Sequence, residues 1–195
     1  MTNSHTHCTG LHLTAVCLLL VLILPGPAVA GQVLASSAER VGDLYVLSVS
    51  AQIDAPLATV YRSITDFDNL AAINPAIEES RLLASDANSR RVRSVIKVCI
   101  LVFCKRVVQV QDVHLLNDHV IEAVVVPAAS DFISGIARWE LTTQDAATVL
   151  VFTDQFEPDF WVPPLIGPWL IKRKLMREVA ETAMYIELKY TNESK

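Results

Sequence analysis

No stretch of this chain is rich enough in lysine and arginine to follow the phosphate backbone of a nucleic acid. The 195 residues include 16 Lys and Arg against 21 Asp and Glu, a formal net charge of −5. The motifs GxxxxGK[ST], GxGxxG, HExxH and GxSxG are also missing from the sequence. We therefore predict no nucleic-acid partner, and none of these motifs marks a catalytic site.

Charged residues are few, and apolar residues dominate. Charged residues make up 19% of the chain and apolar residues 52%, so a substantial core can be buried and disorder is not expected. No apolar run reaches the roughly 20 residues that a transmembrane helix needs. The length suits one globular domain.

The first thirty residues have the pattern of a signal peptide. Residues 15–24 are all apolar, and a Pro-Gly-Pro turn leads from them to Ala28-Val29-Ala30, a small-residue cleavage site. We predict a signal peptide over 1–30 and export to the periplasm or the medium. Because residues 1–12 contain no Lys or Arg, an uncleaved N-terminal membrane anchor remains the alternative.

Cysteine is scarce beyond this leader, where only Cys99 and Cys104 remain. An even number of cysteines in an exported protein indicates a disulfide, and a chain reversal across the four intervening residues would place the two side by side. The alternative is a pair of buried free thiols.

Hydrophobic periodicity predicts one strand, two short helices, a series of six strands and a long helix. Residues 31–43 are small and polar and are expected to form a flexible lead-in. In the long helix, Lys174/Glu178 and Arg177/Glu181 form i,i+4 pairs assigned to the solvent face. The predicted strands are 44–53, 78–85, 90–99, 104–115, 119–126, 136–143 and 148–157, and the helices are 56–64, 66–73 and 166–190.

This order predicts an α+β fold in which a curved antiparallel sheet of six to seven strands wraps around the C-terminal helix. One helix cannot fill so wide a sheet. Either bulky side chains fill the remaining space or a cavity for an apolar ligand is left.

Three segments carry a family resemblance. Residues 60–83 contain Thr65-Asp66-Phe67, then Ile73-Asn74-Pro75, then a strand with Ser80; residues 135–142 read GIARWELT; and 158–175 are a proline-rich approach to the long helix. Over about residues 44–190 the chain resembles the START-like, or SRPBCC, superfamily. It is most similar to the polyketide cyclase/dehydrase and coenzyme Q-binding branches.

The resemblance implies a helix-grip fold over 44–191 with a deep apolar pocket between the sheet and the C-terminal helix. The superfamily holds lipid carriers, quinone-binding proteins, cyclases, dehydratases and hydrolases, so it does not select one activity. No catalytic motif spans it, and we assign no catalytic residue.

Alternation within the strands and the 3–4 spacing of the helix predict the pocket walls. Gln109 and Gln111 share a strand face, which is either a polar wall of the pocket or the outside of the sheet. The predicted wall residues are Trp139, Leu141, Val124, Val126, Val151, Leu175, Val179 and Ile186.

Two apolar segments are predicted to form the pocket mouth or a membrane contact, the alternative being burial in ordinary packing. Ile100, Leu101, Val102 and Phe103 lie between the two cysteines. Phe160, Trp161 and Trp169 lie in the approach to the long helix, where the following Lys172-Arg173-Lys174 suits an anionic membrane surface.

No metal or cofactor is predicted. His114 and His119 flank a turn together with Asp112 and Asp118, but a metal site needs three or four converging ligands. Turn-flanking histidines of this kind are usually solvated.

The leading hypothesis is an exported, monomeric binding protein that holds a hydrophobic small molecule, either a lipid or a quinone- or polyketide-like compound. The second is an enzyme of the cyclase/dehydrase type that uses the same pocket. The third is a membrane- or partner-docking protein with a collapsed pocket. The apolar character of the strands favours binding over catalysis.

Overall fold

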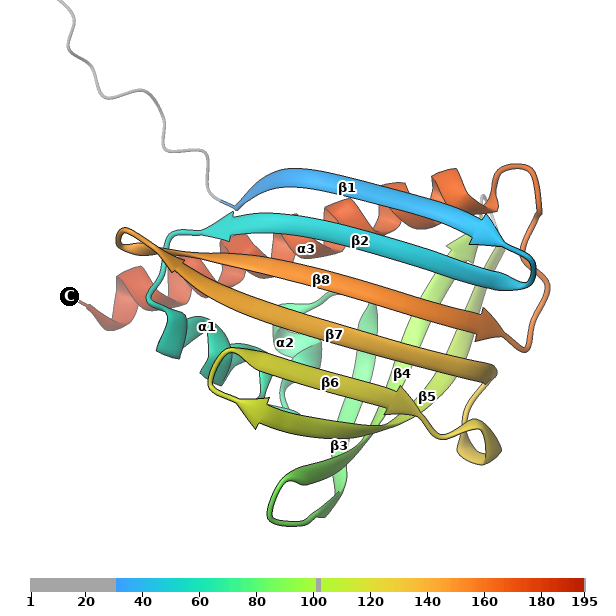
Figure 1. Cartoon of the computed structure of the whole chain (residues 1–195), viewed down its shortest axis with the longest axis horizontal. Coiled ribbons are helices and arrows are strands. Elements are labelled where there is room, and N and C mark those ends of the chain that lie inside the picture. The colour runs from blue at the N-terminus through green and yellow to red at the C-terminus, as the bar shows by residue number, and fades with distance from the viewer. Residues whose placement is uncertain (1–30, 101–102, 195) are drawn as a thin grey trace, which may run out of the picture.

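A single curved antiparallel sheet and one long helix form the molecule (Figure 1). The computed structural model describes residues 31–100 and 103–194. The strand order is β1-β2-β8-β7-β6-β5-β4-β3. The strands are β1 (Gln32–Val41), β2 (Leu44–Ile53), β3 (Ile77–Ser85), β4 (Ser89–Ile100), β5 (Phe103–Asn117), β6 (Val120–Val125), β7 (Phe132–Gln144) and β8 (Ala147–Pro158); the helices are α1 (Leu57–Ile64), α2 (Leu70–Ile73), the 3-10 turn η1 (Pro127–Ala129) and α3 (Gly167–Glu193).

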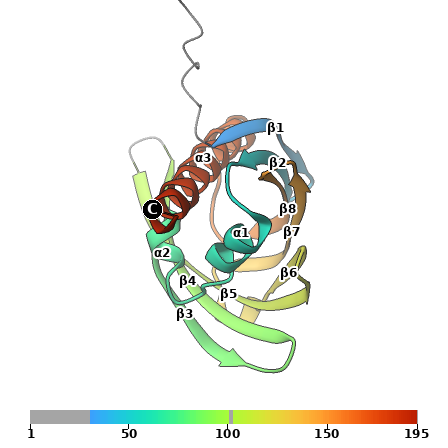
Figure 2. The ribbon, with the colours of Figure 1, turned by 90° about the vertical axis from the view of Figure 1, so that its left-hand side faces the viewer.

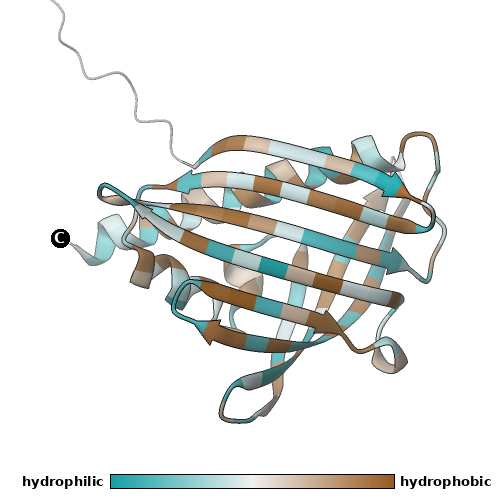
Figure 3. Ribbon diagram, viewed as in Figure 1, coloured by the Kyte–Doolittle hydropathy of each residue, from teal (hydrophilic) through white to brown (hydrophobic). Residues whose placement is uncertain are grey.

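The α+β helix-grip architecture predicted from the sequence is confirmed. The sheet curls into a trough, and α3 lies along its open side with α1 and α2 at one end (Figure 2). The hydropathy colours change repeatedly between hydrophobic and hydrophilic along the strands (Figure 3). In β2, for example, every second residue from Tyr45 to Ile53 is buried, which places one face of the strand against the core.

The core is densest where α3 meets the sheet and α1. Ala183 and Ile186 of α3 are fully buried against Ile53 of β2 and Val60 of α1. Burial of an isoleucine or valine side chain such as Ile186, Ile53 or Val60 stabilises the fold by about 1.5–3 kcal/mol. The C-terminal half of α3 is therefore fixed to the sheet.

Residues 31–43 are a strand and not the predicted flexible lead-in. β1 pairs with β2 over nearly its whole length, and the two strands join at a turn in which Gly42 has φ +65°. The small polar residues of β1 suit an edge strand with one row of its backbone groups left unpaired. β1 brings the strand count to eight, one more than the upper limit predicted.

The second short helix is smaller than predicted. Turns occupy most of 66–69, and α2 covers only Leu70–Ile73. Asn74 ends it, and its side-chain oxygen accepts a hydrogen bond from the amide of Ala76 at 2.9 Å. This compact turn leads directly into β3.

The predicted reversal between the cysteines is confirmed. Cys99 faces Cys104 across the β4–β5 hairpin, and their sulfur atoms are bonded. Leu101 and Val102 lie outside the described residues, as do the side chains of Ile100 and Phe103.

No helix within 31–100 and 103–194 has the length and apolarity needed to cross a membrane. The predicted signal peptide, 1–30, lies outside the described residues.

Candidate functional site

A cavity of about 340 Å³ lies between the concave face of the sheet and α3. This size is within the range typical of small-molecule sites. Most of its walls are apolar. The apolar lining includes Leu47, Ile64, Phe67, Leu70, Ile73, Val92, Ile96, Val98, Val113, Ile121, Phe132, Trp139, Leu150, Phe152, Phe156, Phe160, Leu170, Ile171, Leu175 and Val179.

One face of α3 supplies the helical wall. The residues that reach the cavity recur at intervals of three and four from Gly167 to Ala183, which places them on a single face of the helix. Gly167 begins this face in close packing, since a Cβ there would lie 2.9 Å from Val162 Cγ1. The start of α3 is therefore packed closely against the segment that follows β8.

The strands supply the opposite wall. Trp139 of β7 and Phe152 of β8 are cross-strand partners with ring centroids 5.0 Å apart, and both rings line the cavity. Their tilted contact fixes two large apolar surfaces side by side. A flat or elongated apolar ligand would find a rigid surface here.

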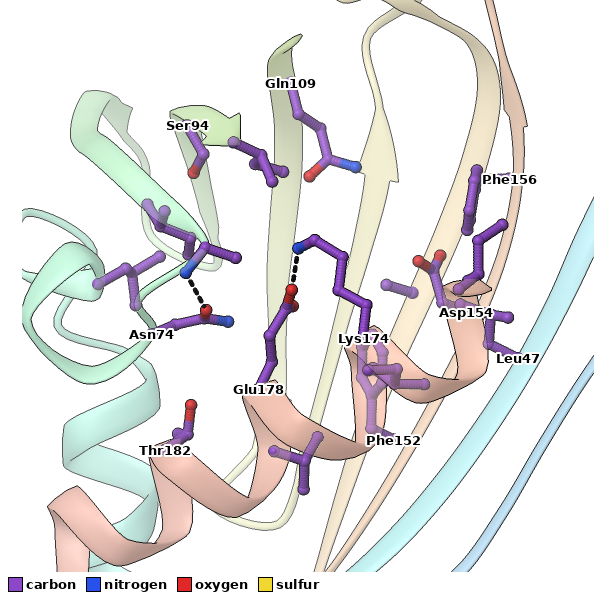
Figure 4. A pocket seen from close by; sticks show the side chains of 18 of the residues that line it. Leu47, Asn74, Ser94, Gln109, Phe152, Asp154, Phe156, Lys174, Glu178 and Thr182 are labelled. Carbon is purple, nitrogen blue, oxygen red and sulfur yellow. Dashed lines mark hydrogen bonds and ion pairs between the residues drawn. The ribbon is translucent and has the colours of Figure 1, made fainter. Parts of the chain in front are cut away.

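Asp154 introduces a carboxyl group into this apolar wall. It follows Phe152 on the inward face of β8, and Figure 4 shows its carboxyl group pointing into the cavity. Burial raises the pKa of Asp154 to about 7, although a hydrogen bond from the backbone of Gln155 acts in the opposite direction. Near neutral pH the group is therefore divided between its acid and its carboxylate form, and the acid form can donate a hydrogen bond.

An ion pair lies on the helical wall. The ammonium of Lys174 and the carboxylate of Glu178, one turn apart on α3, form an ion pair at the cavity surface (Figure 4). Burial, together with the positive charge of Arg177, lowers the pKa of Lys174 to about 8. The solvent-facing position predicted for this pair is wrong; Arg177 and Glu181 form the exposed pair.

Neutral polar groups complete the lining. Gln109 and Gln111 of β5, Ser94 of β4, Asn74 and Thr182 reach the cavity. Of the two alternatives left open for the glutamines, the inward one is correct. Donors and acceptors thus occur on both the sheet side and the helix side of the cavity.

The predicted wall residues are distributed over three places. Trp139, Leu175 and Val179 line the cavity. Leu141 and Ile186 are buried in the packed core next to it.

The other three predicted wall residues do not line it. Val124 is 38% exposed, because in β6 the inward residues are its neighbours Ala123 and Val125. Val151 alternates with Leu150 and Phe152, which do line the cavity, and so faces outward. Val126 follows the end of β6 and is half-buried.

The predicted mouth residues around the start of α3 fall into two groups. Phe160 lines the cavity and packs edge-on against Phe132, with Lys105 Nζ 5.0 Å from its ring centroid. Trp161 and Trp169 are instead 75% and 56% exposed. Of the predicted pair of apolar segments, only this one is described together with its side chains.

Metal-binding residues do not cluster in the part of the chain that the structure describes. Nowhere in it do three or more His, Cys, Asp or Glu side chains converge as a metal site would require. His114 is paired with Ser89 in the sheet and His119 lies in the turn before β6.

The sequence of residues 46–187 matches the family model for polyketide cyclase/dehydrase and lipid transport. The chain belongs to this family. The match spans α1, α2, seven of the eight strands and most of α3, so it covers both walls of the cavity. Among the curated proteins compared with it, none matches this family member.

Solved structures share the fold of this family member at low sequence identity. TTHA0849 from Thermus thermophilus is 19% identical with a TM-score of 0.60, over 77% of this chain and 99% of that one. The Zhui aromatase/cyclase from Streptomyces sp. R1128 is 17% identical with a TM-score of 0.59, over 78% and 96%. A START superfamily protein from Mycobacterium smegmatis is 17% identical with a TM-score of 0.59, over 76% and 98%.

Proposed function

We propose that this family member is an exported binding protein for a hydrophobic small molecule, held between the sheet and α3. The observation that carries the proposal is the cavity of about 340 Å³ with its largely apolar lining. Transfer of apolar ligand surface from water into it would contribute roughly 25 cal/mol per Å². Export rests on the leader pattern of residues 1–30.

The polar groups indicate what kind of molecule fits. Asp154 lies on the sheet side, and the Lys174–Glu178 pair lies on the helix side. A pure hydrocarbon would give the carboxyl group of Asp154 no hydrogen-bond partner and would remove water from the Lys174–Glu178 pair, and both effects are unfavourable. The preferred ligand is therefore a lipid or a quinone- or polyketide-like compound whose apolar skeleton carries hydroxyl or carbonyl groups.

Native mass spectrometry of the protein exported from cells, followed by organic extraction, tests this proposal. We expect a discrete added mass that is recovered as a lipid-like or prenylated compound. Val179→Trp should abolish the added mass, because the indole would occupy the cavity. Met184→Trp is the matched control, since Met184 is 44% exposed on α3. An apo mass for the wild type, or equal loading of both variants, would contradict the proposal.

The polar lining favours one alternative, an enzyme of the cyclase/dehydrase type. Such an enzyme needs an ionisable group with a pKa near the working pH, and burial raises the pKa of Asp154 to about 7. Conversion of an extracted compound by the wild type, but not by Asp154→Asn with ligand loading retained, would establish catalysis. Recovery of unchanged compound from both proteins would favour the binding function.

The exposed aromatic segment suits a contact with an anionic membrane surface. We define the apolar patch as Trp161, Leu165, Ile166 and Trp169, which are 40–95% exposed. The guanidinium of Arg173 lies 5.6 Å from the ring centroid of Trp169. Aromatic side chains beside a cation match the headgroup region of an anionic membrane, and Phe160 connects this segment to the cavity.

A further inference from the structure

Glu187 of α3 is a buried carboxylate that the ligand cavity does not use. Its side chain is 7% exposed. Its Oε1 atom accepts hydrogen bonds from the backbone N–H groups of Gly31, at 3.1 Å, and Asp54, at 2.8 Å. None of the ion pairs found within residues 31–100 and 103–194 includes Glu187.

A buried carboxylate without a cation is costly, because two amide hydrogen bonds replace only part of the hydration that it loses. Among the described residues that line the pocket next to Glu187, none is a cation. Gln32, Gln52 and Asp54 line a small polar pocket next to it, and Asp54 contributes a second carboxyl group. The site is thus rich in acceptors and suited to an ammonium group.

The backbone nitrogen of Gly31 already lies where such an ammonium group would have to be. Its φ is +64°, and a Cβ there would lie 2.9 Å from the carbonyl oxygen of Ala180 and 3.1 Å from Ala183 Cβ. Only glycine fits this backbone without a shift of α3. The nitrogen of residue 31 is therefore held directly against the helix that carries Glu187.

The same nitrogen follows the expected cleavage site. Ala28-Val29-Ala30 precede Gly31 in the sequence and form the small-residue pattern that ends a signal peptide. Hydrolysis of the Ala30–Gly31 peptide bond by a signal peptidase consumes one water molecule. It leaves a carboxylate on Ala30 and an α-ammonium on Gly31.

We propose that Glu187 is the receptor for the N-terminal ammonium that removal of the leader creates. Processing converts a hydrogen bond between an amide and a carboxylate into an ion pair that joins the start of β1 to α3. In the uncleaved chain Gly31 offers one N–H and no charge. In the processed chain it offers a positive charge and up to three donors. Cleavage therefore stabilises the contact between the start of β1 and α3. This inference rests on the proposed export but not on the proposed ligand.

The test starts from the full chain expressed with its own leader in an exporting host. The intact mass of the purified protein should show Gly31 as the first residue. An amine-reactive ester at neutral pH then labels the α-amine in preference to ordinary lysines, because the α-amine has the lower pKa; Lys174, whose pKa burial lowers to about 8, lies on a different peptide. Peptide mapping gives the labelling rate of Gly31 itself.

In the folded wild type we expect the α-amine to react roughly tenfold or more slowly than in the urea-unfolded protein, which corresponds to a shift of about one pKa unit or more. Glu187→Gln should abolish most of this protection. The matched control Glu181→Gln removes a carboxylate from the exposed pair with Arg177 on the same helix, and it should keep the protection. A form that retains Ala30 should melt roughly 4 °C below the processed protein, because it lacks the ion pair.

Three results would overturn the inference. The first is a purified protein that begins at another residue or keeps its leader. The second is an α-amine that reacts equally fast in the folded and the unfolded wild type, a comparison that needs no variant to fold. The third is equal protection in the wild type and Glu187→Gln. Ligand loading affects none of these readouts, so the failure of the binding proposal would be distinguishable.

Discussion

Asp154 is a carboxyl group placed among aromatic rings, and its protonation couples the cavity to the stability of the fold. Phe152 and Phe156 flank it on the inward face of β8. Its pKa is raised by burial from an ordinary value near 4 to about 7. Because the folded-state pKa lies above the unfolded one, the stabilising contribution of Asp154 is complete below about pH 4 and is lost as the pH rises to about 7.

The first prediction follows from this sign. Asp154→Asn should raise the melting temperature at about pH 8, where the wild type buries a carboxylate, and should leave it nearly unchanged at about pH 4. Thermal denaturation at the two pH values measures the effect. Asp159→Asn, at an exposed position, is the control and should shift neither value. If the difference in melting temperature between the wild type and Asp154→Asn were the same at both pH values, the carboxyl group would not be desolvated.

Two assignments of individual residues could not be made correctly from the sequence. Both faces of β8 carry apolar side chains, so alternation alone could not decide between Val151 and Phe152. The Lys174–Glu178 pair was misplaced for a different reason: charge normally indicates the wet face of a helix. The polar groups that line this cavity depart from both rules. Trp139 was easier to assign, because charged Arg138 and Glu140 occupy the other face of β7.

At the scale of elements, the β4–β5 hairpin is held together at its tip by a covalent bond. Cys99 and Cys104 are both exposed and directly paired across the hairpin. The closed loop is short, so the chain-entropy contribution of the bond to stability is modest, about 2 kcal/mol. Its main effect is to keep the two strands paired at the end that lies farthest from the β3–β4 turn.

The second prediction concerns this bond. The double variant Cys99→Ser, Cys104→Ser should lose about 2 kcal/mol of unfolding free energy, measured by urea denaturation. A reducing agent should produce the same loss in the wild type and no change in the variant. If the reductant destabilised both proteins equally, the effect would not come from the disulfide.

The β4–β5 hairpin and the β1–β2 hairpin were unequally predictable from the sequence. The β4–β5 reversal could be inferred because two cysteines bracket it. The β1–β2 hairpin was missed, although Gly42-Asp43 is a known two-residue turn signal. Mostly exposed small residues in β1 gave no alternation that would have indicated a strand.

At the scale of the whole molecule, the apolar patch places four exposed apolar side chains close together in the sequence at the approach to α3. The protein carries a net charge of −5, yet Arg173 contacts Trp169 within the apolar patch. The cation that contacts this patch therefore has the opposite sign to the net charge of the whole chain. An acidic protein of this kind would approach an anionic bilayer in one orientation, with the patch first.

The third prediction tests that orientation. The variant Trp161→Ser, Trp169→Ser should lose most of its co-sedimentation with vesicles that contain an anionic phospholipid, while its ligand loading stays that of the wild type. Arg173→Gln should weaken co-sedimentation with anionic vesicles and leave the low binding to neutral vesicles unchanged. Loss of ligand loading with unchanged vesicle binding would instead assign the patch to the cavity mouth.

The sheet order has a mechanical consequence. β1 and β3 lie at opposite ends of the strand order and do not pair with each other, so the trough is not sealed into a barrel by backbone hydrogen bonds. α3 spans the gap with side chains alone along the part that lines the cavity, whereas its C-terminal half is fixed in the core. A guest larger than the cavity would therefore have to displace only the first turns of α3 and their side-chain packing. Such a movement breaks no rung of the β-ladder, and a closed barrel of the same strands would have to open a seam to achieve it.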